Sequence, residues 1–501
     1  MGKKIIAVAS VIVLVIIAVP SYLLLSGTIN AKSFGMILNV MTGKGVESPT
    51  ASTLKNRFSL PDGFELELFA SDLPKIRFLK FTPGGDLLVT RPHAGDVLLL
   101  KRDRSKPLEE RPEVQDRITL LSGLKRPHGI ELHAGWLYVA ESDSVGRVRY
   151  NDDEGRIEGE YEIIIDGLTD NGNHWSKSIG VGPDLKLYLS QGSTCNVCLE
   201  EDTRRATFYR YELDGSGESL VATGLRNSVG FDWAPWSGTL YATDNGRDML
   251  GDDYPPCELN AIQQGAFYGW PYFNGDNQVD PDMGSIPAEY GPAPQAPAHN
   301  FRAHNAPLGM RFVQNQAWPE RYRRSALVAL HGSWNRSTLD GYKVVSLHWN
   351  ENGIEERDFL TGFEKEGDVI GRPVDIAQGP DGAVYVSDDY AGAIYRVVYG
   401  DAPQWVSVTE LNERQGPGAE PLWVQEGDLK AMREQGEGLF QQHKCAACHL
   451  PGTEKMGLQG LHERLNHTDI EDILLHPRPP MPVFPLSEPE RRALAVYLLG
   501  R

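Results

Sequence analysis

The chain repeats a short phrase whose clearest copy is Gly379-Pro-Asp-Gly-Ala-Val-Tyr-Val-Ser387, a Pro/Gly/Asp turn followed by an alternating apolar strand. Further copies, the last of them weak, stand at residues 81–90, 133–140, 182–190, 234–243 and 324–330. A unit this short cannot bury both faces of its strands alone, so successive units must pack against one another. Six copies predict a six-bladed β-propeller, in which four-stranded blades surround a central channel.

The repeats also predict how the chain is divided into domains. We expect the propeller at residues 55–402, a linker that contains Pro and Gly at 403–425, and a small all-α domain at 426–501. The interval between the fourth and fifth copies is too long for one blade, so Tyr254 to Asn305 should form an excursion over one face. A chain of 501 residues is long enough for this many separate cores.

The N-terminus predicts export. Lys3 and Lys4 precede 21 uncharged residues, Ile5 to Leu25, and a helix of that length spans the apolar core of a bilayer. We expect residues 1–30 to form an uncleaved transmembrane signal anchor, with the lysines in the cytoplasm and the remainder on the periplasmic side of the inner membrane. A cleaved signal peptide is the alternative, although Ile29-Asn30-Ala31 is a poor cleavage site.

The charge excludes one class of partner. The formal net charge is −19, and no basic cluster is available to meet phosphates. The sequence therefore argues against binding of nucleic acid.

The C-terminal domain carries the motif Cys445-Ala-Ala-Cys448-His449. Two thiols at this spacing can form thioethers to a porphyrin, and the adjacent imidazole can ligate its iron, so we expect a covalently bound haem c. Met481, in the proline-stiffened loop Pro479 to Phe484, is the expected second axial ligand because such a loop holds a thioether at low entropic cost. Met456 is the alternative.

Zinc is the principal rival to haem at this motif. His462 and His467 follow the cysteine pair at a spacing that a Cys₂His₂ site would accept. However, the approach to them contains Pro451 and several glycines, which do not favour the helix of a zinc finger. Zinc also leaves His449 unexplained, so the pattern favours haem over zinc and over a chance CxxC.

Polar residues next to the expected innermost strands are candidates for chemistry at the channel. His174 precedes the third repeat and could act as a general base. His128, in Arg126-Pro-His128-Gly, is placed similarly before another blade. A histidine that only bonds a neighbouring loop is the alternative for His174.

Charged residues gather at the later blades. Arg226 and Asn227 precede the fourth strand repeat, and Arg372 precedes the sixth, with Lys343 between them. Three or four cations around one channel imply an anionic guest with several carboxylates. The segment Asp244 to Asn260 is dense in carboxylates and loop carbonyls, which favours a hard cation such as calcium, although a solvated acidic loop has the same composition.

This constellation resembles the quinoprotein sugar dehydrogenases, which bind pyrroloquinoline quinone on a six-bladed propeller, and especially their L-sorbosone and aldose sugar dehydrogenase branch. The resemblance implies that His174 takes the hydroxyl proton of a sugar or alcohol while hydride passes to the quinone. It also implies that Arg226, a catalytic and cofactor-binding residue, and Asn227 reach the quinone.

The same resemblance implies further ligands. Lys343 and Arg372 would hold carboxylates of the cofactor, and the backbone at Gly246 and Arg247 would hold Ca²⁺. The glucose-oxidising members have a second arginine two residues after the one matched by Arg372, whereas this chain has Val374, so it departs from them in how it grips the cofactor.

The C-terminal segment resembles a short class I cytochrome c, in which Phe440 packs near Tyr497. We therefore expect a quinohaemoprotein oxidoreductase whose haem takes electrons singly from the reduced quinone and passes them to a periplasmic or membrane acceptor.

Two other functions compete with this one, a calcium-dependent, lactonase-like hydrolytic propeller and a recognition propeller without chemistry. The surrounding cations argue against the lactonase. Cys195 and Cys198 lack a following histidine, so we expect a local disulfide there.

Overall fold

The computed structural model describes a propeller unit and a smaller helical unit, and the chain divides into two compact parts. The described residues are 39, 44–108, 110–284, 294–315, 318–400, 426–447, 449, 458, 461, 467–475, 481–482 and 484–500. The expected anchor at 1–30 and the whole of the expected linker at 403–425 lie outside them. Among the described residues, no helix combines the length and apolar character that crossing a bilayer requires.

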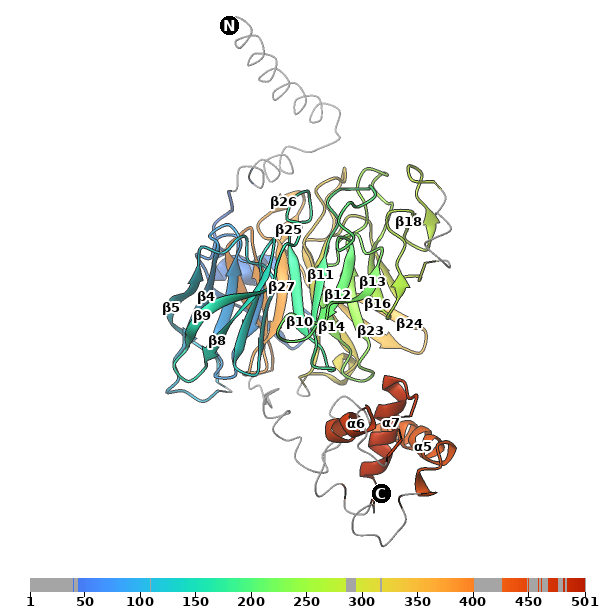
Figure 1. Cartoon of the computed structure of the whole chain (residues 1–501). Helices are drawn as coiled ribbons and strands as arrows, with labels where there is room; N and C mark the ends of the chain where they lie inside the picture. The colour runs from blue at the N-terminus through green and yellow to red at the C-terminus, as the bar shows by residue number, and fades with distance from the viewer. Residues whose placement is uncertain are drawn as a thin grey trace, which may run out of the picture. The chain divides into compact units, whose positions relative to one another are not determined.

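Six main sheets of consecutive strands make up residues 64–399 of the described chain (Figure 1). The first contains β2 (Leu79–Phe81), β3 (Leu87–Arg91), β4 (Asp96–Arg102) and β5 (Val114–Ser122). The second contains β6 (Ile130–His133), β7 (Trp136–Ala140), β8 (Val145–Asn151) and β9 (Arg156–Ile165). The third contains β10 (Lys177–Val181), β11 (Leu187–Gln191), β12 (Thr207–Tyr211) and β13 (Ser219–Thr223). The other three are β14 (Phe231–Trp233), β15 (Leu240–Asp244), β16 (Cys257–Ile262) and β20 (His299–Phe301); β21 (Pro307–Phe312) to β24 (Gly353–Leu360); and β27 (Pro373–Gln378), β28 (Val384–Asp388), β29 (Ala393–Tyr399) and β1 (Phe64–Ala70). The six-bladed propeller is confirmed.

The sixth sheet joins the two ends of the propeller. Its outermost strand is β1, which pairs antiparallel with β29 from Phe64 opposite Tyr399 to Ala70 opposite Ile394. The innermost strands of neighbouring sheets are in contact, including β27 with β2 and β2 with β6. The ring is therefore closed by strands from the beginning and the end of the domain, and β1 covers the edge that β29 would otherwise expose.

One expectation for the fold was wrong in part. Tyr254 to Asn305 is not an excursion throughout, because it contains β16 and β20, the two outer strands of the fourth blade. The insertion lies between them and carries β17 (Ala266–Phe267), which extends the third sheet, and the short pair β18 (Phe273–Asn274) and β19 (Gln278–Val279). The repeat signal marks inner hairpins, so it did not reveal these outer strands.

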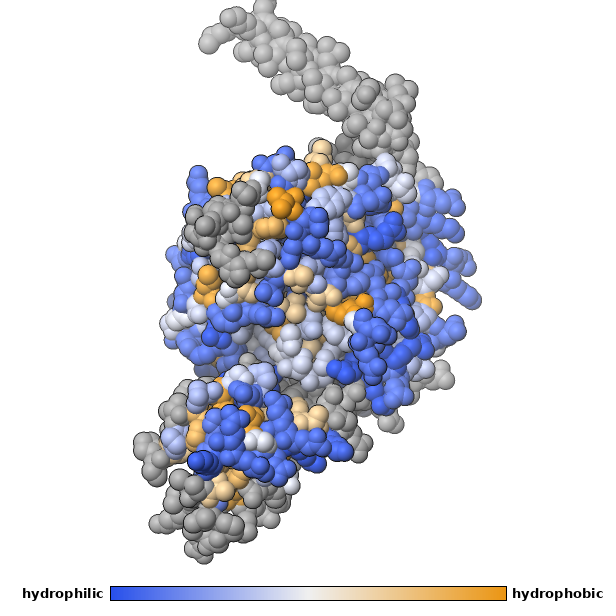
Figure 2. Space-filling model, turned by 90° about the vertical axis from the view of Figure 1, so that its right-hand side faces the viewer, coloured by the Kyte–Doolittle hydropathy of each residue, from blue (hydrophilic) through white to orange (hydrophobic). Residues whose placement is uncertain are grey.

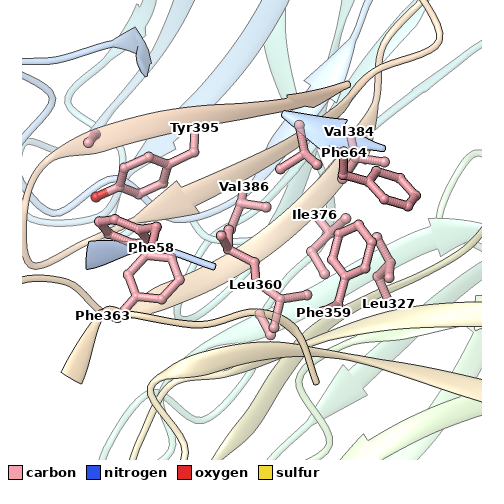
Figure 3. Close-up of a cluster of buried hydrophobic side chains, with 14 of the residues drawn as sticks. Phe58, Phe64, Leu327, Phe359, Leu360, Phe363, Ile376, Val384, Val386 and Tyr395 are labelled. Atoms are coloured by element: carbon pink, nitrogen blue, oxygen red, sulfur yellow. The ribbon is translucent and has the colours of Figure 1, made fainter. Parts of the chain in front are cut away.

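The cores of the propeller lie between adjacent sheets. Figure 3 shows one of them, in which aromatic and branched side chains from the fifth and sixth sheets interdigitate. Phe359 and Phe363 come from the fifth sheet and the segment after it, Ile376 and Tyr395 from the sixth, and Phe64 from β1. Burial of such side chains is the main favourable term that holds one blade against the next.

The helical unit is built on α5 (Glu426–Gln442), α6 (His467–Leu475) and α7 (Glu488–Leu499). α5 and α7 cross closely at Gly436, where a Cβ would clash with Ala493 O and the side chain of Tyr497. Phe440 packs against Tyr497 with ring centroids 5.5 Å apart, as expected. A capping box formed by Ser487 and Glu490 begins α7.

The described surface of the propeller unit is mainly hydrophilic on the face that Figure 2 shows, with hydrophobic residues scattered among the hydrophilic side chains. Large exposed hydrophobic side chains in the described part of the chain include Leu199, Met249 and Trp334. Exposed hydrophobic residues that are scattered singly are normal on a folded domain.

Closure of the ring can be tested at Phe64, whose ring lies 4.7 Å from Trp318, 5.1 Å from Phe359 and 4.9 Å from Tyr399. Phe64→Ala removes these contacts and leaves a cavity, so the free energy of unfolding should fall by about 3–5 kcal/mol in denaturant titrations. Glu65→Ala, which changes an exposed neighbour on the same strand, should alter it by less than about 0.5 kcal/mol. Equal midpoints for the two variants would contradict this account of closure.

Candidate functional site

Residues just before the innermost strands meet at one end of the central channel. Antiparallel pairing also brings the ends of the second strands to this place; Leu79 of β2, for example, pairs with Val89 of β3. Contacts between blades confirm the convergence, because Thr90 Oγ1 donates to His128 O and Arg77 donates to Asp389. We term this end of the channel the mouth; Arg77, His128, His174, Arg226 and Arg372 all precede innermost strands there.

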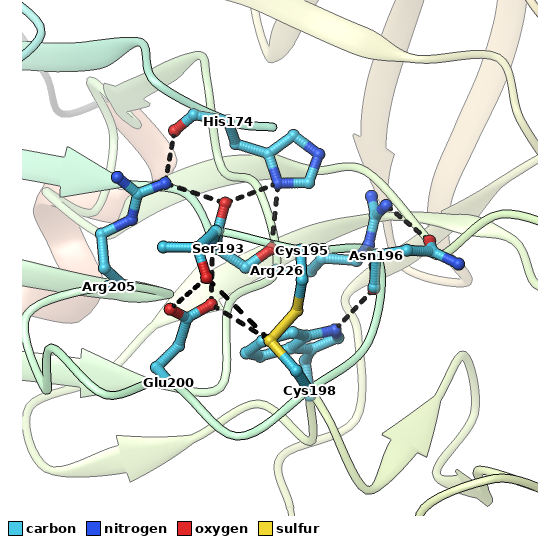
Figure 4. Close-up of a disulfide and its surroundings, with 10 residues drawn as sticks. His174, Ser193, Cys195, Asn196, Cys198, Glu200, Arg205 and Arg226 are labelled. Carbon is cyan, nitrogen blue, oxygen red and sulfur yellow. Dashed lines mark hydrogen bonds between the residues drawn. A yellow bond between two sulfur atoms is a disulfide. The ribbon is translucent and has the colours of Figure 1, made fainter. Parts of the chain in front are cut away.

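His174 lies half-buried at the mouth and is held by the loop after β11 (Figure 4). Its Nδ1 lies 3.0 Å from Ser193 O and 2.9 Å from Ser193 Oγ. Because a carbonyl oxygen only accepts, Nδ1 carries the proton, which leaves a lone pair on Nε2. Burial and the nearby Arg226 and Arg205 guanidinium groups lower the pKa of His174 to about 3. The ring is therefore a neutral base at physiological pH.

His128 differs from His174 although the sequence places them alike. It is fully buried, its Nδ1 lies 3.2 Å from Lys177 O, and its Nε2 lies 3.3 Å from Arg77 Nη2. Burial and the Arg77 charge hold its pKa well below the ordinary value. Both ring nitrogens are engaged, so His128 is built into the blade junction.

Arg226 is buried, with 4% of its surface exposed, and burial lowers its pKa. Its guanidinium donates to the carbonyl oxygens of Asn245 at 3.1 Å and Gly246 at 3.0 Å. It also donates to Asn196 and, at 3.3 Å, to Asp248. These oxygens compensate a charge that would otherwise be costly to bury.

Asn227 lies beside His174. A Cβ at Gly192 would clash with both side chains, so glycine allows them to approach each other across the end of β11. The backbone N–H groups of Arg226 and Asn227 donate to the carboxylate of Asp244. The structure thus brings together three predicted residues, His174, Arg226 and Asn227.

Arg372 also reaches the mouth, and Lys343 lies opposite Leu330, the last residue of the second strand of its blade. Arg372 donates to His331 O at 3.2 Å and to Gly332 O at 3.4 Å, both neutral oxygens. Lys343 begins β23 (Lys343–Asn350), the third strand of its blade, and its ammonium pairs with Asp358 on β24. Its predicted role at the cofactor stays a prediction.

Asp389 is a residue of the mouth that sequence reasoning missed. It accepts from Arg77 at 2.9 Å and from His331 at 3.0 Å. Burial alone would raise its pKa, but His331, Arg77 and Arg372 together lower it. Burial, followed by Arg372, lowers the pKa of His331 to about 4, so neutral His331 donates to the carboxylate. The sequence signal that could have identified Asp389 was its position just after the second strand of the last blade, β28.

Two carboxylates face a small cavity beneath Arg226. Asp244 and Glu258 are opposite each other on β15 and β16 and line a cavity of about 20 Å³, large enough for one water-sized species. Burial, together with the neighbouring Glu258 charge, raises the pKa of Asp244 to about 8, and burial raises that of Glu258 to about 7. Burial thus outweighs the effect of the Arg226 charge on Asp244.

The amide oxygens near this cavity lack partners. Asn245 Oδ1 and Asn260 Oδ1 are buried without a hydrogen bond to any described residue. Two carboxylates with unpaired amide oxygens beside them are a donor set of the kind that Ca²⁺ prefers. Gly246 and Arg247, predicted to offer backbone ligands, line the same cavity, although the Arg247 side chain pairs with Asp280 and Asp282.

The predicted disulfide between Cys195 and Cys198 is confirmed. Its loop lies at the mouth and includes Asn196, which contacts Arg226 (Figure 4). Cys257, left unassigned by the sequence, is a buried free thiol whose pKa burial raises to about 11.

The haem motif is described in part. Cys445 lies in the short helical turn η3 (Cys445–Ala447), and His449 N donates to Cys445 O at 3.1 Å, so the two lie one turn apart. Cys445 and Met481 pack against the same apolar cluster, formed by α5, α6 and α7. This places two predicted haem-binding residues on one core. Cys448, Met456 and His462 lie outside the described residues.

Comparisons with known proteins agree with this arrangement. Residues 74–396 match the family model described as glucose/sorbosone dehydrogenase, and residues 431–498 match that of cytochrome c oxidase, cbb3-type, subunit III. An uncharacterised Borreliella burgdorferi protein is 30% identical over 370 residues, covering 70% of this chain and 93% of its own. A pyrroloquinoline quinone-dependent sugar dehydrogenase of Hypocrea jecorina is 23% identical over 413 residues, and the match covers 69% of this chain and 91% of that protein.

A solved structure supports the fold. The calcium structure of the Trichoderma reesei carbohydrate-active enzyme family AA12 has a TM-score of 0.60 and 22% identity, and the match covers 69% of this chain and 97% of that one. The family model spans well over half of the sequence, across all six blades. The chain therefore belongs to the glucose/sorbosone dehydrogenase family and carries a cytochrome c domain at its C-terminus.

Proposed function

We propose that this chain is a pyrroloquinoline quinone-dependent dehydrogenase that oxidises an aldose, a sorbosone-like sugar or a related alcohol. Electrons pass singly to a covalently bound haem c and then to a periplasmic or membrane acceptor. Residues 1–30 anchor the chain to the inner membrane, a proposal supported by the 21 uncharged residues after Lys3 and Lys4. The observation that carries the catalytic proposal is His174, a neutral base at the mouth beside Arg226 and Asn227.

The residues at the mouth fit the quinone. Its chemistry, when it is bound, is to accept hydride from the substrate carbon, and its carboxylates require cations. Arg226 and Arg372 supply guanidinium groups at the mouth. The Hypocrea jecorina relative, named as dependent on this quinone, supports the assignment.

The chain's own residues account for the proton. Ser193 holds the Nδ1–H of His174, so Nε2 presents its lone pair to the substrate hydroxyl. Arg226 would supply fixed positive charge at the site, where burial strengthens electrostatic interactions. Asn227 adds an amide on the same side of the site.

Removing the base tests this assignment. His174→Ala should keep quinone binding, seen as an unchanged quinone spectrum, but should lower the rate of quinone reduction by sugar about 10²–10⁴-fold. His128→Ala is the control, because its ring is built into the blade junction and its loss should reduce stability more than turnover. An active His174→Ala with an inactive His128→Ala would assign the base to His128.

The same base predicts the pH dependence. With a pKa of about 3, His174 stays unprotonated from pH 8 to pH 5, so the rate of quinone reduction should show no loss from this group. A histidine with an ordinary pKa of about 6.5 would be mostly protonated at pH 5 and the rate would fall about 30-fold.

We also propose that Ca²⁺ binds between Asp244 and Glu258, supported by their facing positions and by the unpaired amide oxygens. Ca²⁺ at about 100 times its Kd should stabilise the chelator-treated protein by about 2.7 kcal/mol, seen as a higher unfolding temperature. Glu258→Gln should abolish most of this shift. Asp253→Asn, which removes an 87% exposed carboxylate of the same segment, should preserve it; loss in both variants would indicate only a solvated acidic loop.

At the haem we propose His449 and Met481 as axial ligands, supported by the packing of Cys445 and Met481 on one cluster. Met481→Ala should abolish the weak near-infrared absorption band that arises from sulfur-to-iron charge transfer, because the thioether is lost. Met456→Ala should retain the band. The opposite pattern would assign Met456, and a purified chain with zinc and no haem would refute the haem site.

A further inference from the structure

The loop between β11 and β12 (Thr207–Tyr211) reaches across the mouth between the proposed base and the proposed cofactor-binding arginine (Figure 4). Ser193 Oγ donates to Cys195 O at 2.7 Å while Ser193 O holds His174. Two residues later, the disulfide from Cys195 to Cys198 closes a short ring of backbone. Asn196 is one of the two residues between these cysteines in the chain.

Asn196 makes five hydrogen bonds to groups from other blades or their loops. Its carbonyl oxygen accepts from Arg226 Nε at 2.9 Å and from Trp270 Nε1 at 3.2 Å. Its Oδ1 accepts from Arg226 Nη2 and from the N–H of Asp248, both at 2.8 Å. Its Nδ2 donates to Asp248 O at 3.1 Å. The side-chain oxygen is thus shared between Arg226 and Asp248.

This geometry constrains the direction of the guanidinium. Nε and Nη2 form one edge of the Arg226 plane, and both bind the same residue, Asn196. Nη1 binds the carbonyl oxygens of Asn245 and Gly246. A planar group held along one edge and at a third nitrogen cannot rotate about Cδ–Nε without breaking charge-assisted hydrogen bonds.

Asp248 completes the frame. Its carboxylate accepts from Arg226 Nη2 at 3.3 Å and from Asn335 Nδ2 at 3.0 Å. Its backbone is held on both sides by the Asn196 amide. Movement of Asn196 would therefore displace both the guanidinium and the carboxylate that accompanies it.

We propose that Asn196 is a positioning residue, which holds Arg226 in one fixed orientation at the mouth beside the proposed quinone site, and that the Cys195–Cys198 disulfide keeps Asn196 in place. The inference rests on the proposed function, since it takes Arg226 as a cofactor-binding residue. The disulfide contributes by reducing the conformations open to the loop. The position of the Asn196 backbone carbonyl depends only on the loop, whereas the position of Oδ1 depends on the loop and on the side chain. Mutation of the side chain and mutation of the disulfide therefore test the two contacts separately.

The first test measures the contact without any cofactor. In apo protein, Asn196→Ala should speed hydrogen–deuterium exchange of the Asp248 amide, which Oδ1 accepts from. Cys195→Ser/Cys198→Ser should do the same because it loosens the loop. Asn151→Ala is the control: Asn151 bonds Glu158 and the Glu154 N–H in the hairpin at the other end of β8 (Val145–Asn151), and its loss should leave the Asp248 segment unchanged.

The second test titrates the apo proteins with pyrroloquinoline quinone. Asn196→Ala loses hydrogen bonds that orient the Arg226 guanidinium, so its Kd for the quinone should rise about 10- to 100-fold. The KM for sugar at saturating quinone should stay within about twofold of wild type. Asn196→Asp, which keeps the oxygen that Arg226 and Asp248 use, should recover part of the affinity, and the double serine variant should raise Kd as well.

The outcomes are distinct. A wild-type protein that binds no quinone refutes the proposed function, while the exchange experiment still decides whether Asn196 holds Asp248. Wild-type quinone affinity in both Asn196→Ala and the double serine variant overturns the positioning role. Unchanged exchange at Asp248 in both variants overturns it as well.

Discussion

The pairing of β1 with β29 is the interaction on which the mouth depends. It closes the ring and brings Arg77 of the first blade within 2.9 Å of Asp389, which follows the second strand of the last blade, although 312 positions separate them in the sequence. Without closure, His331, Arg372 and Asp389 would not face Arg77 and His128. The charged network is therefore a product of the ring and not of any one blade.

Burial of charge then shapes the chemistry of the mouth. Arg226 is nearly inaccessible to water, and its positive charge, together with burial, keeps His174 neutral. A neutral imidazole with one nitrogen held by Ser193 is suited to accept a proton. The same environment leaves Asp244 and Glu258 with raised pKa values, and the proposed Ca²⁺ would favour the carboxylate form of both.

Some of the predicted site residues could be placed from the repeat pattern alone, whereas others depend on partners that are distant in the sequence. His174, Arg226, Asn227 and Arg372 precede innermost strands, so the repeat pattern was sufficient to place them at one end of the channel. Lys343 begins a third strand, and its partner Asp358 comes from the neighbouring fourth strand. Sequence position alone could not reveal that pairing. Asp389 was missed because its partners come from other blades.

The sequence by itself determined the six-bladed fold, the local disulfide and the family, because repeated turns, a CxxC pair and inner-strand motifs are short-range patterns. It also indicated which loop could hold a cation. Only the tertiary structure decided that Asp244 and Glu258 share one cavity and that Asn196 binds Arg226. It also decided that both ring nitrogens of His128 are hydrogen-bonded, whereas His174 is held through Nδ1. These facts depend on contacts between blades and their loops, and such contacts arise only when the ring packs and excludes water from the mouth.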